Sequence, residues 1–259
     1  MVHIATIGTS FITEEFLAGA AAVEGLSLGA VYSRSLEKGE ALARRFGAQQ
    51  VYTDLEALAG AEIDAVYIAS PNSLHFAQCE MFLKRDKHIL CEKPVTLTPE
   101  ELFSLQSLAK QRNLVFAEAI MMMYSPARNV VKNALRSIGK ITSAHFDFSQ
   151  LSSRYELLKK GELPNIFNRK MGGGCLMDLG CYCVYPAVDF FGVPARVFGS
   201  AVLLDDGTDS NGSAVFEYPD KQVTMTYSKI GQDRAGSQII GDEGTLHIGS
   251  ISKLTDITL

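Results

Sequence analysis

The tripeptide Glu92-Lys93-Pro94 follows a short apolar run, His88 to Cys91. Proline cannot continue an interior strand, and it pushes the residue before it out of the helical region. We therefore expect Lys93 in extended geometry at the point where a buried strand stops. If that strand belongs to a parallel sheet, its carboxyl end is where ligands bind. Lys93 is thus a candidate for one half of a proton-transfer pair.

A second set of reactive side chains follows the glycine run 172–174. Asp178 and Tyr182 are four residues apart in a stretch of helical composition, so they share one face of the expected helix. Gly180 between them lets another backbone or a ligand come close. A free tyrosine has a pKa of about 10, too high for an efficient base near neutrality, but a nearby ammonium lowers it. The alternatives are a buried aromatic for Tyr182 and a helix-stabilising hydrogen bond for Asp178.

The first elements along the chain are a strand, a tight turn and a helix. Val2–Ile7 is rich in β-formers, and 14–23 has helical composition. A turn at a helix N-terminus presents backbone N–H groups and the positive helix end to an anion. The turn resembles the dinucleotide fingerprint G-x-G-x-x-G/A, of which only the first glycine is present. The candidate cofactor residues here are Gly8, Thr9, Ser10, Phe11 and Ile12; the alternative is an ordinary strand-to-helix turn.

The second strand, 26–32, predicts which nucleotide is bound. A Rossmann domain that selects NAD usually carries an acid near the end of this strand to hold the ribose 2′-hydroxyl. This chain has Ser33 and Arg34 there, followed by an amphipathic helix over 37–46. A guanidinium and hydroxyls suit a 2′-phosphate. We therefore predict NADP in preference to NAD, the alternative being that Arg34 is a solvated loop residue.

Further strands alternate with helices up to about residue 123. Strands are expected at 51, at 63–69 and at 115–119, with helices at 73–85 and from the Thr98 cap to about Gln111. The loop after 63–69 is placed to pass over a nucleotide. Its candidate cofactor residues are Ser70, Pro71, Asn72 and His75, although His75 could equally be a partly exposed helix residue. Met122 and Met123 line a substrate pocket or belong to the core.

The pattern of apolar and polar residues changes after a helix at 127–136. The segment 141–149 alternates like a half-buried strand, and from residue 196 five short alternating runs are separated by turns. This pattern predicts an antiparallel meander, unlike the strand–helix repeat before it. We therefore expect an α/β chain with two domains, 1–123 with a parallel sheet and 124–259 of α+β type.

Composition excludes several classes of protein. The net charge is −5 with no basic block, which gives no support for nucleic acid or acidic-membrane binding. No apolar stretch reaches membrane-spanning length, and a strand-like run starts at Val2, so no leader peptide is expected. The five cysteines form no C-x-x-C pair and are expected to be reduced thiols of a cytoplasmic protein. Cys181 and Cys183 are expected to be buried side chains, the alternative being metal ligands, and we expect no metal.

Taken together, the incomplete glycine fingerprint, Glu92-Lys93-Pro94 and the Gly172-Gly173-Gly174…Asp178-x-Gly180-x-Tyr182 pattern resemble the Gfo/Idh/MocA oxidoreductase family. The resemblance implies an N-terminal Rossmann domain with a doubly wound parallel sheet. It also implies a C-terminal domain with a largely antiparallel, open-faced sheet that is often used for homo-oligomerisation, as a dimer or tetramer. The activity it implies is hydride transfer between NAD(P) and a hydroxyl or carbonyl of a sugar, polyol or related diol.

Within that resemblance the reactive residues take specific roles. Tyr182 is the proton donor and acceptor, Lys93 is its electrostatic partner and a ligand of the substrate oxygen, and Asp178 orients a substrate hydroxyl or the lysine. Glu92 positions the loop or the nicotinamide side. Tyrosine at 182, where many members have histidine, is similar to branches that commonly prefer NADP. Family members usually continue further, so either the sequence is part of a longer chain or its sheet is reduced and covered by a partner subunit.

Two other activities are compatible with the resemblance. One is a cofactor-binding sensor or regulator without turnover, which would have no need for Lys93, Asp178 and Tyr182. The other is a reductase of an unsaturated or aromatic dicarbonyl compound, which would use the same cofactor and residues. The sequence disfavours the sensor. It does not distinguish an enzyme that acts on a sugar or polyol from a reductase of a dicarbonyl compound.

Overall fold

The computed structural model describes all residues from 1 to 259, and its internal contacts divide the chain into two compact units. Unit 1 is Met1–Ala119 and unit 2 is Ile120–Leu259. The sequence predicts this boundary at residue 123. Each unit is described by itself.

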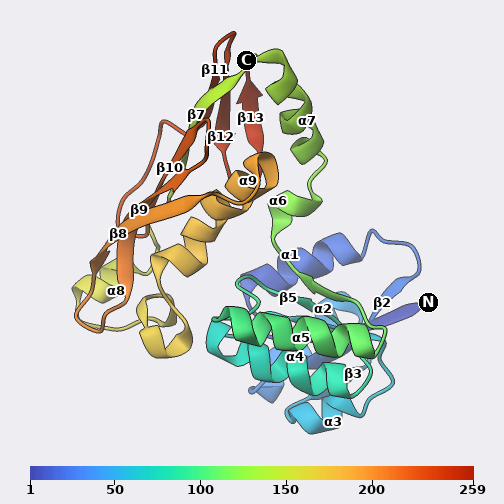
Figure 1. The fold of residues 1–259 in the computed structure, drawn as a ribbon. Helices are drawn as coiled ribbons and strands as arrows, with labels where there is room; N and C mark the ends of the chain where they lie inside the picture. The colour runs from blue at the N-terminus through green and yellow to red at the C-terminus, as the bar shows by residue number, and fades with distance from the viewer. The chain divides into compact units, whose positions relative to one another are not determined.

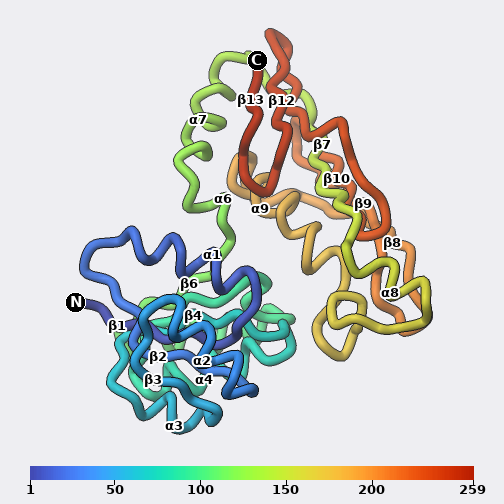
Figure 2. The backbone as a smooth tube through the Cα atoms, turned by 180° about the vertical axis from the view of Figure 1, so that it is seen from behind, coloured from blue at the N-terminus to red at the C-terminus, as the bar shows by residue number.

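Unit 1 contains a six-stranded sheet in the order β3-β2-β1-β4-β5-β6, whose strands are labelled between Figure 1 and Figure 2. Every pair of neighbours in it is parallel. This is the doubly wound order, and the predicted Rossmann sheet is confirmed. The strands are β1 (Val2–Ile7), β2 (Leu26–Tyr32), β3 (Gln50–Tyr52), β4 (Ala65–Ile68), β5 (His88–Cys91) and β6 (Phe116–Glu118).

Helices cover both faces of this sheet, and alternate residues of the strands pack against them. Ile4 and Val31 belong to the core on the side of α1 and α2, whereas Ala5 and Ala30 belong to the core on the side of α4 and α5. Because side chains alternate along a strand, both sets must be apolar. The helices are α1 (Phe11–Ala20), α2 (Leu36–Phe46), α3 (Leu55–Ala59), α4 (His75–Lys84) and α5 (Pro99–Gln111), with a short 3₁₀ turn at Asn72–Leu74.

The starts of two helices show how local chemistry sets their bounds. Helix α5 has the predicted cap: the Thr98 hydroxyl accepts a hydrogen bond from the Glu101 N–H at 3.3 Å, with Pro99 at the first position. Helix α1 begins at Phe11 and not at residue 14, so that prediction is wrong. The chain turns into the helix directly after Ser10, whose backbone is extended.

Unit 2 contains a seven-stranded sheet in the order β13-β12-β11-β7-β10-β9-β8. The predicted meander is wrong in one respect. Strand β7 lies between β10 and β11 and pairs with β10 in parallel, while the other pairs are antiparallel (Figure 1). The strands are β7 (Ile141–Ser149), β8 (Arg196–Leu203), β9 (Asp209–Glu217), β10 (Gln222–Ser228), β11 (Ser237–Gly241), β12 (Thr245–Ser250) and β13 (Thr255–Thr258).

One face of this sheet is covered and the other is open. Along β10, Val223, Met225 and Tyr227 are buried, while Gln222 and Thr224 are exposed. Helix α9 packs on the buried side, and the predicted open-faced sheet is confirmed. The helices of unit 2 are α6 (Met121–Tyr124), α7 (Ala127–Ala134), α8 (Tyr155–Lys159) and α9 (Cys181–Phe191), with 3₁₀ turns at Leu135–Ser137, Asn165–Phe167 and Arg169–Met171 and a π-helical segment at Leu176–Gly180.

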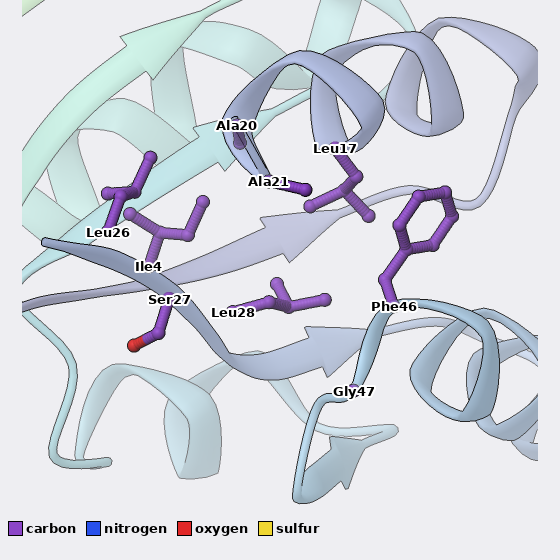
Figure 3. A pocket seen from close by; sticks show the side chains of 9 residues that line it. All are labelled: Ile4, Leu17, Ala20, Ala21, Leu26, Ser27, Leu28, Phe46 and Gly47. Atoms are coloured by element: carbon purple, nitrogen blue, oxygen red, sulfur yellow. The ribbon is translucent and has the colours of Figure 1, made fainter. Parts of the chain in front are cut away.

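None of the helices has both the length and the apolar character needed to cross a bilayer. An apolar pocket of about 200 Å³ opens in unit 1 between the end of α1 and the start of β2 (Figure 3). Leu17 of α1, Phe46 of α2 and Leu28 of β2 line it. It lies beside the first residues of β2, whereas the predicted cofactor residues follow the last residues of the strands.

Candidate functional site

A pocket of about 410 Å³ lies where β1, β2 and β4 end at the carboxyl edge of the unit 1 sheet. It brings together seven of the predicted cofactor residues, from three loops that are far apart in the sequence. They are Gly8, Thr9, Ser10, Ser33, Arg34, Ser70 and Pro71. Tyr32, Ser35, Lys38, Leu74 and Gln78 are among the further lining residues.

Gly8 gives the pocket its close backbone approach. Its φ is +112°, and a Cβ at this position would lie 2.6 Å from the carbonyl oxygen of Ala69. Only glycine avoids both the strained conformation and the clash. The first N–H groups of α1 have no partner within the helix, and the Ser10 side chain makes no cap. This end of the pocket therefore fits a pyrophosphate.

The end of β2 places hydroxyls and cations together. The Ser33 hydroxyl accepts a hydrogen bond from the Ser35 N–H at 3.2 Å, and the Ser35 hydroxyl accepts one from the Lys38 N–H at 3.4 Å. Arg34 and Lys38 are exposed and line the same pocket. Lys38 was not predicted from the sequence. It could have been, because it is a basic residue four positions after Arg34, in the first turn of the following helix.

His75 is fully buried, so the alternative of an exposed helix residue is wrong. Its Nδ1 lies 2.8 Å from the carbonyl oxygen of Pro94, and its Nε2 lies 2.9 Å from that of Ser70. The side chain thus joins the loop after β4 to the loop after β5. Burial lowers the pKa of His75, and the two carbonyls oppose that shift. Ser70 is also held through its hydroxyl, which donates to Gln78 Oε1 at 2.7 Å.

Lys93 lies half-buried between two acids at this sheet edge. Glu92 accepts a hydrogen bond from the Tyr67 hydroxyl at 2.6 Å, which fixes its carboxylate over β4. Glu118, the last residue of β6, accepts from the Val95 N–H at 2.9 Å. Burial raises the pKa of the Glu118 carboxyl, and the charge of Lys93 acts against that rise. The Lys93–Pro94 peptide bond is cis.

Glu118 is a second residue that sequence reasoning missed. It ends β6, the neighbour of β5 in the sheet, so its place at the carboxyl edge follows from the strand order alone. The other predicted residues lie outside the pocket. Phe11 is exposed, Ile12 is half-buried in α1, and Asn72 begins the 3₁₀ turn.

The predicted substrate residues of unit 2 fall into two groups. Met122 is fully buried in the core of unit 2 and Met123 packs against that core, which favours the core interpretation for both. Tyr182 is 7% exposed, in the first turn of α9, with its ring edge-to-face on Phe148 at 5.3 Å. Asp178 lies in the π-helical segment just before α9. The predicted helix is therefore present, but its first turns are wider than an α-helix.

Gly180 serves a different close approach from the one expected. The sequence suggests another backbone or a ligand beside it. In the structure the neighbours are side chains: Leu176 Cδ1 would be 2.9 Å, and the Tyr227 ring 3.1 Å, from a Cβ at this position. The missing side chain lets β10 pack against the π-helical segment.

The cysteines provide no metal site. All five are free, and Cys79, Cys91, Cys175 and Cys183 are buried. Burial raises the pKa of Cys175 to about 12 and that of Cys183 well above its ordinary value, so both stay neutral thiols near neutrality. No group of three or more metal-ligating side chains gathers anywhere in the structure.

Comparison with family models gives a match in each unit. Residues 2–119 match the oxidoreductase family with an NAD-binding Rossmann fold, GFO_IDH_MocA, and residues 128–247 match the GFO/IDH/MocA C-terminal domain. The chain is 39% identical to the uncharacterized oxidoreductase YgjR of Escherichia coli and 37% identical to the scyllo-inositol 2-dehydrogenase (NADP(+)) IolU of Bacillus subtilis. Both alignments cover 98% of this chain and 77% of the relative.

Solved structures show the same fold. KijD10, a 3-ketoreductase from Actinomadura kijaniata in complex with NADP and TDP-benzene, superimposes with a TM-score of 0.84 at 24% identity. That match covers 96% of this chain and 77% of the other. The scyllo-inositol dehydrogenase from Lactobacillus casei with bound NAD(H) and scyllo-inositol gives 0.82 at 21% identity, covering 96% and 76%.

The buried His75 predicts a pH-dependent stability. Because its pKa is lowered in the folded chain, the unfolded chain binds a proton that the folded chain does not as pH falls below about 6.5. Stability contributed by the neutral ring is present above that pH and is lost below it. Urea unfolding between pH 7 and 5 will show a pH slope that is shallower in His75→Gln, by at most about 1.4 kcal/mol per pH unit.

The matched control is Phe82→Leu, which weakens the core beneath the same helix without removing a titrating group. It is expected to lower the free energy of unfolding at every pH and to keep the wild-type slope. Equal slopes for wild type and His75→Gln would show that His75 does not titrate between the two states.

Proposed function

We propose that this chain, which belongs to the Gfo/Idh/MocA oxidoreductase family, transfers a hydride between NADP and a CH–OH or carbonyl group of a sugar, polyol or related diol. The chain is an NAD(P)-dependent oxidoreductase, and its relatives include enzymes named for inositol, diol and xylose substrates. One observation carries the proposal: the pocket at the carboxyl edge of the unit 1 sheet and Lys93, which follows β5 at the same edge, occur in a chain that also carries Asp178 and Tyr182.

The proposed cofactor site is the pocket at the ends of β1, β2 and β4. The turn at Gly8 and the start of α1 would hold the pyrophosphate, and Arg34 with Lys38 would hold a 2′-phosphate. Two cations and two hydroxyls with no acid at the end of β2 support NADP over NAD. The bound cofactor would supply or accept the hydride.

The proposed proton chemistry uses three side chains. Tyr182 gives or takes the hydroxyl proton of the substrate, and the ammonium of Lys93 stabilises its phenolate. Asp178 orients a substrate hydroxyl. Glu92 and Glu118 hold the loop that carries Lys93, through the Tyr67 hydroxyl and the Val95 N–H. The sensor alternative gains no support from the relatives, which are named as dehydrogenases and reductases.

The first test is turnover. A panel of inositols, hexoses, pentoses and cyclic diols with NADP is expected to yield NADPH, read by its near-ultraviolet absorbance. Tyr182→Phe will reduce kcat on the active substrate by a factor of ~10² or more, because general acid–base catalysis contributes at least that much. NADPH binding, measured by fluorescence, is expected to persist in this variant.

Tyr185→Phe is the matched control, since it removes a hydroxyl from the same helix while leaving the ring packed on the core of unit 2. Its turnover should stay close to wild type. Unchanged turnover in Tyr182→Phe would remove the assigned role, and no hydride transfer to any compound of the panel would count against the enzyme and for a sensor.

The second test is cofactor choice. Arg34→Ala with Lys38→Ala is expected to weaken NADPH binding by about ten- to a hundred-fold, since hydrogen bonds to a charged group are worth ~1.5–3 kcal/mol. NADH binding should change little, because NADH has no 2′-phosphate. Arg44→Ala on the same helix, paired with Glu40 and outside the pocket, is the control. Equal or tighter binding of NADH by the wild type would contradict the NADP assignment.

We also propose a homo-oligomer, a dimer or tetramer, formed through the unit 2 sheet. All eight residues of the edge strand β8 are exposed, including the apolar Val197, Phe198, Val202 and Leu203. An apolar edge strand of this length invites pairing with another chain. Sedimentation velocity is expected to give a dimer or larger species, and Phe198→Lys with Val202→Lys should yield a monomer. Phe103→Lys, on exposed α5 of unit 1, is the control, and a monomeric wild type would overturn the proposal.

A cytoplasmic location is supported by the cysteines. Five free thiols without a disulfide suit a reducing compartment. The location stays a prediction. When cells that produce the protein are fractionated, the protein is expected in the cytoplasmic fraction.

A further inference from the structure

Unit 2 contains a fully buried lysine that the proposed mechanism does not use. Lys229 directly follows β10 and is 1% exposed. Lysine is almost never fully buried unless its charge is paired. Its backbone is fixed on both sides, since its N–H donates to Ser210 at 3.0 Å and its carbonyl accepts from Ser152 at 2.9 Å. The side chain therefore leaves the sheet from a well-determined point.

The ammonium of Lys229 is held by three groups. Its Nζ lies 2.7 Å from Asp178 Oδ2 and donates to the Ile166 carbonyl oxygen at 3.0 Å. It also lies over the face of the Phe167 ring, 5.5 Å from the centroid. A buried ion pair is stable only when its remaining hydrogen-bonding positions are satisfied, and these contacts provide that.

The ion pair is asymmetric. The Lys229 side chain is 2% exposed, whereas that of Asp178 is 32% exposed. The lysine therefore lies behind the carboxylate and is shielded from any ligand, while the carboxylate reaches the surface of unit 2. A second contact fixes the same two elements, because the ring of Tyr227 packs where Gly180 lacks a side chain.

We propose that Lys229 is a positioning residue that fixes the carboxylate of Asp178 for the substrate, an inference that rests on the proposed function. The ammonium holds Oδ2 from behind, which restricts the rotation of the carboxylate. A carboxylate can only accept hydrogen bonds, and one of its oxygens already accepts from the ammonium. The partner that Asp178 then selects is a hydrogen-bond donor, such as a hydroxyl of a polyol.

The test is a double-mutant cycle in the full chain. Wild type, Lys229→Met, Asp178→Asn and the double variant are compared by kcat and KM on the substrate found in the panel. Lys229→Met is expected to reduce kcat by about ten- to a hundred-fold, as misplacement of a reacting group does. In the Asp178→Asn background the same substitution should change kcat by less than about threefold, because a residue that acts through Asp178 has nothing left to position. NADPH binding should be the same in all four.

The cycle separates positioning from a general structural role. If Lys229 only holds the Ile166 and Phe167 segment in place, its loss reduces kcat equally in both backgrounds, which overturns the inference. No effect on kcat in either background overturns it as well. Lys132→Met is the control, since it removes an ion pair of Asp189 further along α9 and is expected to keep kcat.

Lys229→Met leaves Asp178 without its buried counterion and could fail to fold. The double variant, Asp178→Asn with Lys229→Met, has no unpaired buried charge. Its kcat is then compared with the kcat of Asp178→Asn alone. A lower kcat in the double variant would count against the inference. Thermal unfolding gives a reading independent of turnover: the shifts in Tm of the single variants should sum to more than that of the double variant. If the Tm shifts show this coupling but the wild type transfers hydride to no compound of the panel, the proposed function is wrong, whereas the stabilising contact between Lys229 and Asp178 is confirmed.

Discussion

Burial of the unit 1 sheet on both faces is the constraint from which its site follows. Strands β1 and β4 send alternate side chains into two apolar cores, one beneath α1 and α2 and one beneath α4 and α5. A polar side chain on either face would need a buried hydrogen-bond partner. Most of the polar groups therefore lie at or beyond the strand ends, although Thr6 of β1 is a buried exception. Gly8, Ser33, Ser70 and Lys93 all lie in loops beyond the strand ends, and one sheet edge collects them.

The same constraint explains why this half of the fold could be predicted well. Apolar runs with β-branched residues predicted the exact bounds of β1 and β2. Glycine and proline residues predicted the turns, and Thr98 predicted the start of α5. Candidate residues that directly follow a strand could be located from the sequence, because the end of each apolar run marks their position. Glu118 was missed because its importance depends on which strands are neighbours in space, a property that no local pattern contains. Lys38 did have a local signal, its place four residues after Arg34 in the first turn of α2.

Unit 2 was harder for a physical reason. Alternation located five of its later strands, but it carries no information on the order in which strands pair. The meander was the simplest order, and the insertion of β7 between β10 and β11 departs from it. The partner of Asp178 was hidden for the same reason. In the sequence Lys229 is an ordinary lysine at the end of an alternating strand, and only the folded sheet places its ammonium against Asp178 of the π-helical segment.

The place of β7 also decides when unit 2 can form during synthesis. His145 bonds Thr224, 79 residues later, and Thr142 bonds the backbone of Ile240, 98 residues later. In unit 1 the longest pairing, between β1 and β4, spans 61 residues, and that unit can close its sheet as soon as β6 has left the ribosome. Strand β7 must wait unpaired until β10 and β11 have been synthesised, because both of its partner strands follow it in the chain. During that interval the apolar face of β7 is exposed on the nascent chain, and chaperones are the natural protection for such a segment.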